Sequence, residues 1–578
     1  MTHLANDPAD FAAEALEGFA ALHPDLVQAV PGGVIRATPP RAGHVAVVLG
    51  GGSGHHPAFA GWVGPGMGHG AVCGNIFSSP SESQVLSVAR AAEAGGGVLF
   101  VPINYAGDIL HFGAAREALE GDEVPARLVA VTDDIASGGP AEHHQRRGIA
   151  GSFLVVKVLA AAADSGMALD PLADLAVRVN DATRSLGVAF SGCTLPGADQ
   201  ALFSVPTGQM AVGLGIHGEP GLSHQELGTA QDVADLLVDG LTADRPLSTG
   251  GAVAVLVNGL GATTPDELYL VAARVQSRLV AAGARVVAPV VGSLVTSMDM
   301  AGVSVSLLDL DEETEPYWLA PAHTSSFWRA ETGSSTPPVS ASRSTDVDPR
   351  AASAGTDRGR QPDITAPADP RSAAAAGWAH EALGRAVSAV EAQEAELGAL
   401  DAVAGDGDHG AGMVRGARAA HQAMGAGVAD GAGLGTALHR AGTAWSDVAG
   451  GTSGALWGAG LRASGDSLGD DAEPTAGQVL DAVQAFLDAV QSRGGAQPGD
   501  KTMVDALVPF VEQLRHELDR GSPLREAWSA AADAASQAAQ ATADHAARTG
   551  RSRTHGDASI GTPDPGAVSL ALIAGSTN

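Results

Sequence analysis

Lysine is almost missing from this sequence, where Lys157 and Lys501 stand alone among 578 residues. Acidic residues outnumber basic ones by 65 to 33, which gives a formal net charge of -32. This charge opposes the attraction that supplies most nucleic-acid affinity, so neither a nucleic acid nor an anionic membrane is an expected partner. Any phosphate must be bound through metal ions, arginine or backbone amides instead.

Cysteine is equally scarce. Cys73 and Cys193 are too few for a disulfide framework and lack the CxxC spacing of a zinc or redox site, so a reducing cytoplasm is the expected location. Residues 1–24 have no basic start and no continuous apolar core, which indicates neither secretion nor membrane insertion.

The organisation of the chain changes at a segment rich in Ser, Thr, Pro and Ala, which predicts a flexible linker over residues 326–371. Before it, β-rich runs alternate with Ala-rich helical stretches, so residues 1–325 are expected to form an α/β domain with parallel sheets. A break at 246–251 predicts two α/β lobes there. After the linker, helical periodicity predicts an all-α domain over 372–578. The strands expected are 44–49, 98–101, 128–131, 253–257, 286–291 and 303–308.

The strongest chemical signal is LDAVAGDGDHG, in which Asp401, Asp406 and Asp408 fall within one glycine-broken turn. Hard cations such as Mg²⁺ take oxygen ligands and complete their shell with substrate phosphates, so this turn suits a metal-nucleotide site. A solvated turn at a helix end is the alternative. A calcium loop fits worse, because Gly410 occupies a ligand position and no Glu closes the loop.

A second glycine-rich segment, AGGTSGALWGAGL, stands directly before a helical run. Free N–H groups, hydroxyls and a positive helix dipole at such a point favour phosphate binding. Capping of the helix by Thr452 or Ser453 is the alternative interpretation.

Two further segments, GAQPGDKTMVDAL and GTPDPGA, are typical of ordered turns. GAQPGDKT nearly matches a P-loop, but Asp500 separates Gly499 from Lys501, which excludes the Walker spacing.

GDGDHG, GGTSGALWG, PGDKTMVDAL and DPGA, in this order, closely resemble the nucleotide-binding DhaL-type domain of dihydroxyacetone kinases. The resemblance implies an all-α eight-helix barrel in which Asp401, Asp406 and Asp408 hold two Mg²⁺ ions on the phosphates of ATP. The other nucleotide-binding residues that it implies are His409, Gly450, Gly451, Thr452, Ser453, Gly499, Asp564 and Gly566.

The first half must supply the phosphate acceptor. One predicted strand runs into GGGSGHHP, whose glycines let a ligand approach the backbone closely but lack the dinucleotide spacing. Another leads into INYAGDILHFG, which leaves Asp108 beyond the end of the strand, where α/β ligands bind. GLGIHGEPG places His217 between glycines. Read singly, His217 could be a structural histidine and Asp108 a helix cap.

Eight ordered segments favour the functional interpretation: GGGSGHHP, AVCGNIFSSPS, NYAGDILHFG, DDIAS, RRGIAG, GLGIHGEPG, LVNGLGATT and SMDMAG. Together they resemble the substrate-binding DhaK-type domain of the same family. This implies that His217 adds to a substrate ketone as a covalent hemiaminal, that Asp108 is the general base, and that His55 stabilises charge. Such a tether selects ketones over glycerol. The substrate-binding residues implied are Gly52, Ser53, Gly54, Ser78, Ser79 and Asn104.

Four positions depart from the family pattern: His56 replaces an acid, Ile103 a lysine, Asn75 an aspartate and Ala106 a threonine. These residues lie on the loops that are expected to shape the sugar pocket, so they can change which ketose fits. The sequence therefore predicts an ATP-dependent dihydroxyacetone kinase, with a four-carbon ketose such as erythrulose as the alternative substrate.

Other functions stay open at this point. A phosphotransferase-system component, a non-catalytic ketose sensor and a lyase that splits FAD to cyclic FMN all occur among proteins of this kind. The presence of both halves in one chain favours the self-contained kinase, since linkage raises the effective concentration of donor near acceptor. A homodimer is implied by the resemblance alone.

Overall fold

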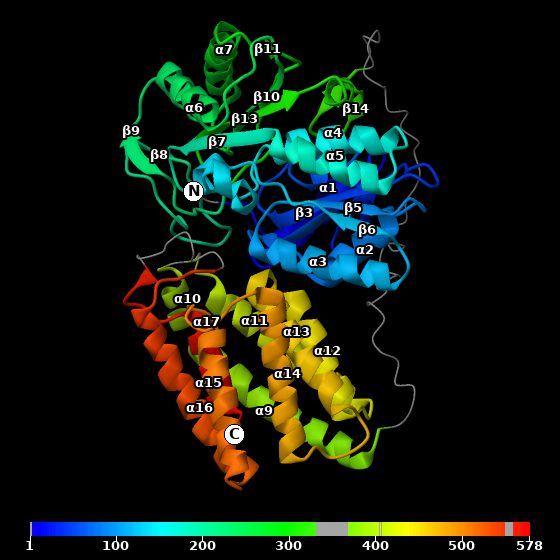
Figure 1. The fold of residues 1–578 in the computed structure, drawn as a ribbon, viewed down its shortest axis with the longest axis vertical. Helices are drawn as coiled ribbons and strands as arrows, with labels where there is room; N and C mark the ends of the chain where they lie inside the picture. The colour runs from blue at the N-terminus through cyan, green and yellow to red at the C-terminus, as the bar shows by residue number, and fades with distance from the viewer. Residues whose placement is uncertain (1–2, 331–367, 404, 406, 550–558, 578) are drawn as a thin grey trace. The chain divides into compact units, whose positions relative to one another are not determined.

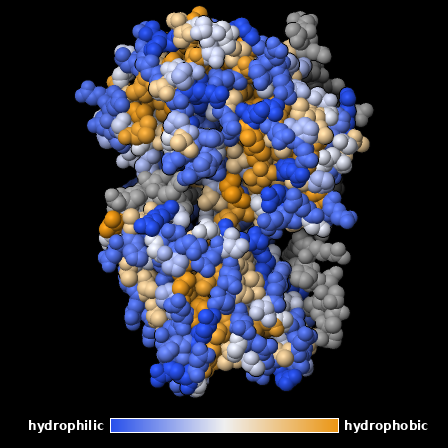
Figure 2. Space-filling view, in the orientation of Figure 1, coloured by the Kyte–Doolittle hydropathy of each residue, from blue (hydrophilic) through white to orange (hydrophobic). Residues whose placement is uncertain are grey.

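The computed structural model describes residues 3–330, 368–403, 405, 407–549 and 559–577 (Figure 1). The chain divides into two compact units, Met1–Thr356 and Asp357–Asn578. Most of the predicted linker lies outside the described residues, so the domain limits stay a prediction. Hydrophilic side chains cover most of the face of each unit seen in Figure 2, and the apolar residues gather in the cores described below.

The first lobe of unit 1 is built on a mixed sheet, which has six strands among the described residues. Their order is β1 (Val27–Val30), β2 (Gly33–Arg36), β4 (Gly70–Ile76), β3 (Ala46–Ser53), β5 (Val98–Pro102) and β6 (Ala126–Leu128). The pairs β4–β3, β3–β5 and β5–β6 are parallel, whereas β1–β2 and β2–β4 are antiparallel. Because β3, β4 and β5 run in one direction, the loops that follow them leave from the same edge.

Helices cover both faces of this sheet (Figure 1): α2 (Glu82–Ala92) and α3 (Ala106–Gly121) on one, α4 (Ser152–Asp164) and α5 (Leu169–Asp181) on the other. Successive side chains of a strand point to opposite faces. In β3, Val48 accordingly joins the core with α2 and α3, and Val47 joins the core with α4 and α5. The strand is apolar throughout because both faces are buried.

The second lobe contains another sheet, whose described strands are β11 (Arg285–Val286), β10 (Ala252–Gly259), β13 (Gly302–Leu310), β7 (Thr183–Ala189), β8 (Gln209–Val212) and β9 (Ser223–Glu226), with β12 (Val290–Gly292) also on β10. Helices α6 (Ala230–Asp244) and α7 (Pro265–Ala281) cover one face. The α/β fold of two lobes is confirmed.

Two expectations about this lobe are wrong. Its sheet is not parallel, since β10–β13, β13–β7, β7–β8 and β8–β9 all pair antiparallel. The lobes also do not divide at residues 246–251, which connect α6 to β10, because the second sheet already includes β7. β7 reads TRSLGVA, and its small and polar residues give a weak strand signal even though every one of them is buried.

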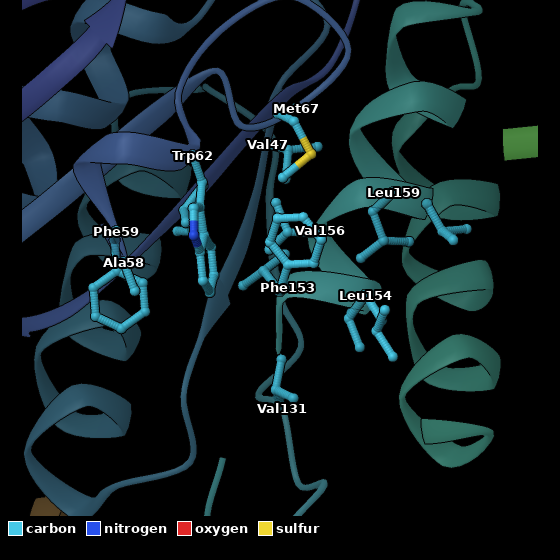
Figure 3. Close-up of a cluster of buried hydrophobic side chains, with 14 of the residues drawn as sticks. Val47, Ala58, Phe59, Trp62, Met67, Val131, Phe153, Leu154, Val156 and Leu159 are labelled. Carbon is cyan, nitrogen blue, oxygen red and sulfur yellow. The ribbon is translucent and has the colours of Figure 1, made fainter. Parts of the chain in front are cut away.

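Helix α4 lies between the two sheets and binds the lobes together. It is buried over Ser152–Ala163, and its core cluster includes Val47 of the first sheet and Leu256 of the second. Figure 3 shows Phe153 of α4 beside Trp62, whose ring centroid is 5.5 Å away. The remaining described elements of unit 1 are α1 (Phe11–Leu22), α8 (Thr314–Leu319), β14 (Ala322–His323), β15 (Trp328–Arg329) and the short 3-10 helices at Ala60–Trp62, Ile135–Ser137 and Pro140–Gln145.

Unit 2 is all-helical, as predicted. Its described helices of twelve or more residues number eight, with the short α10 in addition: α9 (Pro370–Ala392), α10 (Glu394–Asp401), α11 (His409–Ala429), α12 (Leu434–Ala449), α13 (Gly451–Leu468), α14 (Ala476–Gly494), α15 (Val504–Asp519), α16 (Leu524–Ala541) and α17 (Pro565–Ser576). Small residues let them approach closely. A Cβ on Gly442 of α12 would lie 2.7 Å from the carbonyl oxygen of Gly458 of α13, so these helices touch through their backbones.

Within the part of the chain that the structure describes, no helix combines the length and the apolar character needed to cross a bilayer.

Replacing Phe153 by Ala should destabilise unit 1 by roughly 3–5 kcal/mol, because a fully buried ring between the sheets leaves a cavity. Hydrogen exchange should detect this loss of stability as faster exchange in peptides of unit 1. Leu270→Ala, on the exposed side of α7, is the matched control and should change stability by no more than about 0.5 kcal/mol. Equal effects of both substitutions would contradict the role given to α4.

Candidate active site

Two buried histidines meet where the lobes join. His55 follows β3 of the first sheet and His217 follows β8 of the second, and their Nε2 atoms are 3.0 Å apart. Backbone hydrogen bonds tie the His55 loop to the segment between β12 and β13 of the second lobe: the carbonyl of His55 accepts the N–H of Thr296 at 3.3 Å, and that of Gly54 accepts the N–H of Met298 at 3.0 Å. The hydroxyl of Ser297, in the same segment, donates to the carbonyl of Ile216 beside His217. The contact of the rings is therefore fixed by the packing of both lobes.

Each ring is also held at its other nitrogen. His55 Nδ1 is 2.7 Å from the carbonyl oxygen of Thr296, to which it donates. His217 Nδ1 is 2.9 Å from Glu219 Oε1, and the backbone N–H of His217 donates to Glu219 Oε2 at 3.1 Å. Since the carboxylate receives the Nδ1 hydrogen, Nε2 is the nitrogen of His217 that can react.

Burial and charge set the ionisation of this group. Burial, and then the His217 ring, lower the pKa of His55 to about 3. Burial alone would raise the pKa of Glu219, but the His217 ring and the Arg147 guanidinium hold it well below its usual range. Arg147 lies 2.7 Å from Asp134 and 3.9 Å from Glu219. Glu219 is therefore a carboxylate at neutral pH.

Aromatic rings enclose the pair. Phe77 stacks on His55 at a centroid distance of 5.0 Å and meets His217 edge-on at 5.1 Å, while Tyr105 meets His217 edge-on at 4.7 Å. Phe77 has a φ of 56°, and its neighbour Ser78 passes so close to β3 that a Cβ on Gly52 would lie 2.7 Å from the Ser78 nitrogen. Gly52 is thus required for the turn that places Phe77 over the rings.

The other residues predicted for the sugar follow the carboxyl ends of the parallel strands. Gly52, Ser53 and Gly54 end or follow β3, Ser78 and Ser79 follow β4, and Asn104 and Asp108 follow β5. The Asn104 amide donates to the carbonyl of Arg146 at 2.7 Å. Asp108, 2% exposed, is in the first turn of α3, directly after Tyr105.

The positions that depart from the family pattern surround the histidine pair without joining it. Ile103 is part of the main core. Asn75 is exposed, and its carbonyl accepts the N–H of Ser78 at 3.1 Å. His56 turns toward α1, 5.6 Å from the ring of Phe19, and lines a cavity of about 570 Å³ with Gly52, Ser53 and Gly54.

In unit 2 the acidic turn connects α10 to α11. Asp401 ends α10, and its Oδ2 accepts the backbone N–H of His409 at 3.3 Å, while Asp408 directly precedes α11. Asp406 lies outside the described residues. Among the residues that are described, no three His, Cys, Asp or Glu side chains are grouped to hold a metal ion, so the predicted trio stays a prediction.

His409 connects this turn to α17. Its Nε2 is 2.9 Å from the hydroxyl of Ser569. Burial lowers the pKa of His409, although Asp401 and Asp408 act in the opposite direction. The ring is therefore placed to form hydrogen bonds as a neutral group.

The glycine-rich segment forms the turn from α12 to α13. Gly450 and Gly451 have φ values of 67° and 59°, and Gly450 is the N-cap, which provides no side chain to cap the helix. The alternative in which Thr452 or Ser453 caps α13 is thus not supported. A Cβ on Gly412 would lie 3.8 Å from the carbonyl oxygen of Ala449, so this turn adjoins the start of α11.

Lys501 does not face a phosphate. Its Nζ donates to the backbone carbonyls of His545 at 3.1 Å, Ser559 at 2.6 Å and Thr562 at 2.7 Å. The preceding turn is held by Asp505, which accepts the N–H groups of Thr502 and Gly499. Lys501 therefore fixes the segment that leads into α17.

Asp564 is the N-cap of α17 and accepts the N–H of Ala567 at 2.7 Å. Burial raises its pKa to about 7, and the charges of Asp505 and Asp401 add to this. A Cβ on Gly566, two residues on, would lie 3.6 Å from the Met503 nitrogen. A hard cation such as Mg²⁺ binds carboxylate oxygens and reduces the repulsion between them. These buried carboxylates therefore fit this ion.

Sequence reasoning missed four residues of the histidine site: Phe77, Tyr105, Arg147 and Glu219. Glu219 and Arg147 both stand inside the quoted motifs GLGIHGEPG and RRGIAG. The sequence offered one signal for Glu219, its place two residues after His217. Its contact with Arg147 depends on the fold.

Replacing Lys501 by Met should destabilise unit 2 by about 3 kcal/mol, because three carbonyls lose a charged donor. Hydrogen exchange should accelerate at 542–549 and 559–564. Arg520→Met, exposed at the far end of α15, should leave both segments unchanged. Unaltered exchange in the Lys501 variant would show that the segment is held by other contacts.

Comparison with known proteins matches both units. Residues 17–326 match the Dak1 domain family and residues 403–577 the DAK2 domain family. An L-erythrulose 1-kinase of Mycolicibacterium smegmatis is 49% identical over 99% of this chain and 98% of its own length. A D-erythrulose kinase of the same organism is 48% identical over 99% and 97%. The crystal structure of the dihydroxyacetone kinase from C. freundii with AMP-PNP and Mg²⁺ is 29% identical, covers 100% of this chain and 99% of its own, and has a TM-score of 0.52.

Similarity to enzymes over the full length favours the kinase over the non-catalytic ketose sensor. The chain belongs to the family of single-chain, ATP-dependent ketose kinases that combine a Dak1 and a DAK2 domain.

Proposed function

We propose that this chain is an erythrulose kinase, which transfers the γ-phosphate of ATP to a terminal hydroxyl of the ketose. The observation that carries the proposal is the buried His217, whose Nδ1 is engaged by Glu219 so that Nε2 is left to react. The relatives that are 48–49% identical are named for erythrulose. They support the four-carbon ketose better than dihydroxyacetone, which the sequence had favoured.

His217 captures the ketose in this proposal. Its Nε2 forms a bond to the carbonyl carbon, and the carbonyl oxygen becomes a hydroxyl, which gives a hemiaminal. The rings of Phe77 and Tyr105 shield the bond from water. Glycerol has no carbonyl and cannot be held in this way. Gly52, Ser53, Gly54, Ser78, Ser79 and Asn104, at the same edge of the sheet, line the path of the sugar.

Asp108 then acts as the general base on the terminal hydroxyl. It lies in the N-terminal turn of α3, where the helix dipole favours negative charge. His55 donates or accepts a hydrogen bond at the captured oxygen. Removal of the proton by Asp108 lets the hydroxyl oxygen attack the γ-phosphorus in line.

Unit 2 supplies the nucleotide. Asp401, Asp406 and Asp408 would hold two Mg²⁺ ions, and the backbone amides of the turn at 450–453 would bind phosphate oxygens. The turns at the starts of α11, α15 and α17 contain the other predicted residues, His409, Gly499, Asp564 and Gly566. The ions would neutralise the charge of the phosphates, a role for which this chain has no free lysine among the described residues. A homodimer and the domain limits 1–325 and 372–578 belong to the same proposal.

With ATP and Mg²⁺, ADP release should be fast with an erythrulose enantiomer, slower with dihydroxyacetone and at background with glycerol. A coupled assay with D-erythrulose, L-erythrulose, dihydroxyacetone and glycerol side by side checks this order. The assay contains no phosphocarrier protein, so activity also excludes the phosphotransferase alternative. Turnover of glycerol at the ketose rate would refute the tether.

The substitutions His217→Ala and Asp108→Asn should affect different constants. Loss of His217 raises the KM for ketose and leaves the KM for ATP unchanged, because capture is lost. Asp108→Asn lowers kcat by about 10²–10⁴-fold, the usual contribution of a general base. His56→Ala, outside the pair, is the control and should keep kcat. A normal kcat in Asp108→Asn would assign the base elsewhere.

A further inference from the structure

Four groups of unit 1 form one continuous hydrogen-bond chain: the carbonyl of Thr296, the ring of His55, the ring of His217 and the carboxylate of Glu219. Its three links measure 2.7, 3.0 and 2.9 Å. The two ends can only accept. A carbonyl oxygen has no hydrogen, and Glu219 is ionised and already receives the N–H of His217 at 3.1 Å.

The hydrogens on the rings can therefore be counted. The link to Thr296 needs a hydrogen on His55 Nδ1, and the link to Glu219 needs one on His217 Nδ1. The central link needs one more between the two Nε2 atoms, since two lone pairs at 3.0 Å would repel. Two neutral imidazoles carry two hydrogens, whereas this chain requires three. The pair consequently holds one proton and one positive charge in excess.

The surrounding charges compensate this excess. Around the pair lie Glu219 on its own loop, Arg147 and Asp134 between β6 and α4, and Tyr105 before α3. Burial raises the pKa of Tyr105 well above its usual value, so its hydroxyl is neutral. Arg147 is paired at 2.7 Å with Asp134. Two positive charges, of Arg147 and the pair, then face the two carboxylates, and the cluster is neutral overall, as burial requires.

From this count we propose that Glu219 is a positioning residue that stores one proton on the histidine pair, and that this proton is delivered to the ketose oxygen during capture. The inference rests on the proposed tether. As Nε2 of His217 bonds to the carbonyl carbon, the π bond of the carbonyl breaks. The proton held between the rings moves through His55 Nε2 to the new alkoxide.

The step balances within the chain. Before capture, the positive charge is shared by the rings; afterwards, it is on the alkylated His217 ring, whose Nδ1 hydrogen still points to Glu219. His55 becomes neutral and accepts a hydrogen bond from the new hydroxyl. No proton is taken from water, which the closed, aromatic surroundings would admit only slowly. Removing the carboxylate charge should release the stored proton and weaken capture.

The count is tested by NMR on the full chain labelled with ¹⁵N in histidine, free of substrate. We expect three slowly exchanging ring N–H protons from the pair, of which His217→Ala removes two. Glu219→Gln should lose one of the three, because a neutral side chain no longer balances the extra positive charge, and the control Glu226→Gln, exposed on β9, should keep all three. Only two such protons in the unsubstituted chain would overturn the proposal, whether or not Glu219→Gln folds.

Capture is tested separately with erythrulose labelled with ¹³C at the ketone carbon, whose resonance moves to that of a tetrahedral carbon when the tether forms. Glu219→Gln should raise the KM for ketose by about 10–100-fold, as for other residues that orient a reacting histidine, and leave the KM for ATP unchanged. If the unsubstituted chain gives the tetrahedral signal but Glu219→Gln leaves the KM for ketose unaltered, the positioning role of Glu219 is refuted and the tether stands. No tetrahedral signal in the unsubstituted chain would instead refute the tether on which it rests.

Discussion

The contact between the Nε2 atoms of His55 and His217 is the constraint on which the first unit depends. Neither ring could reach the other unless the loop after β3 and the loop after β8 were brought together from two separate sheets. Helix α4, buried on all sides between those sheets, sets their separation. Because reactivity at a captured carbon falls steeply when groups are displaced by about 1 Å, a rigid core around α4 serves the chemistry as well as the stability.

Scarcity of cations shapes both units in the same way. Arg147 is committed to Asp134 and Glu219, Lys157 to the carbonyl of Tyr317, and Lys501 to three carbonyls before α17. These cations stabilise loops from the inside and do not project toward a phosphate. With no lysine directed to this task, the proposed site would meet the negative charge of a nucleotide through metal ions, arginine and backbone amides, and an acidic turn beside a glycine-rich helix start suits this.

The sequence predicts those parts of the fold whose signal is local. β5 and β10 are largely apolar runs and β13 alternates apolar residues with serine, and all three were placed within two residues. The helices of unit 2 follow their periodicity. β7 was missed, since it is made of Thr, Arg, Ser and Gly although buried, and 286–291 proved to be two short strands. In the site, the motifs pointed to His55 and His217, whose rings the structure brings into contact, while the role of Asp108 stays a prediction. Glu219 needed the structure, because its pairing with Arg147 joins residues far apart in the chain.

The arrangement also separates capture of the ketone from choice of the ketose. The proposed tether would require only a carbonyl and the pair of rings, whatever lies beyond the neighbouring carbons. Ile103 belongs to the core, Asn75 is on the surface, and the ring of His56 lies beside Phe19, so none of these side chains is a link of the hydrogen-bond chain. Substitution at these positions can therefore change the shape of the sugar loops without altering the reacting nitrogen. In the proposed mechanism, one covalent step would thus serve ketoses that differ in length and in hand.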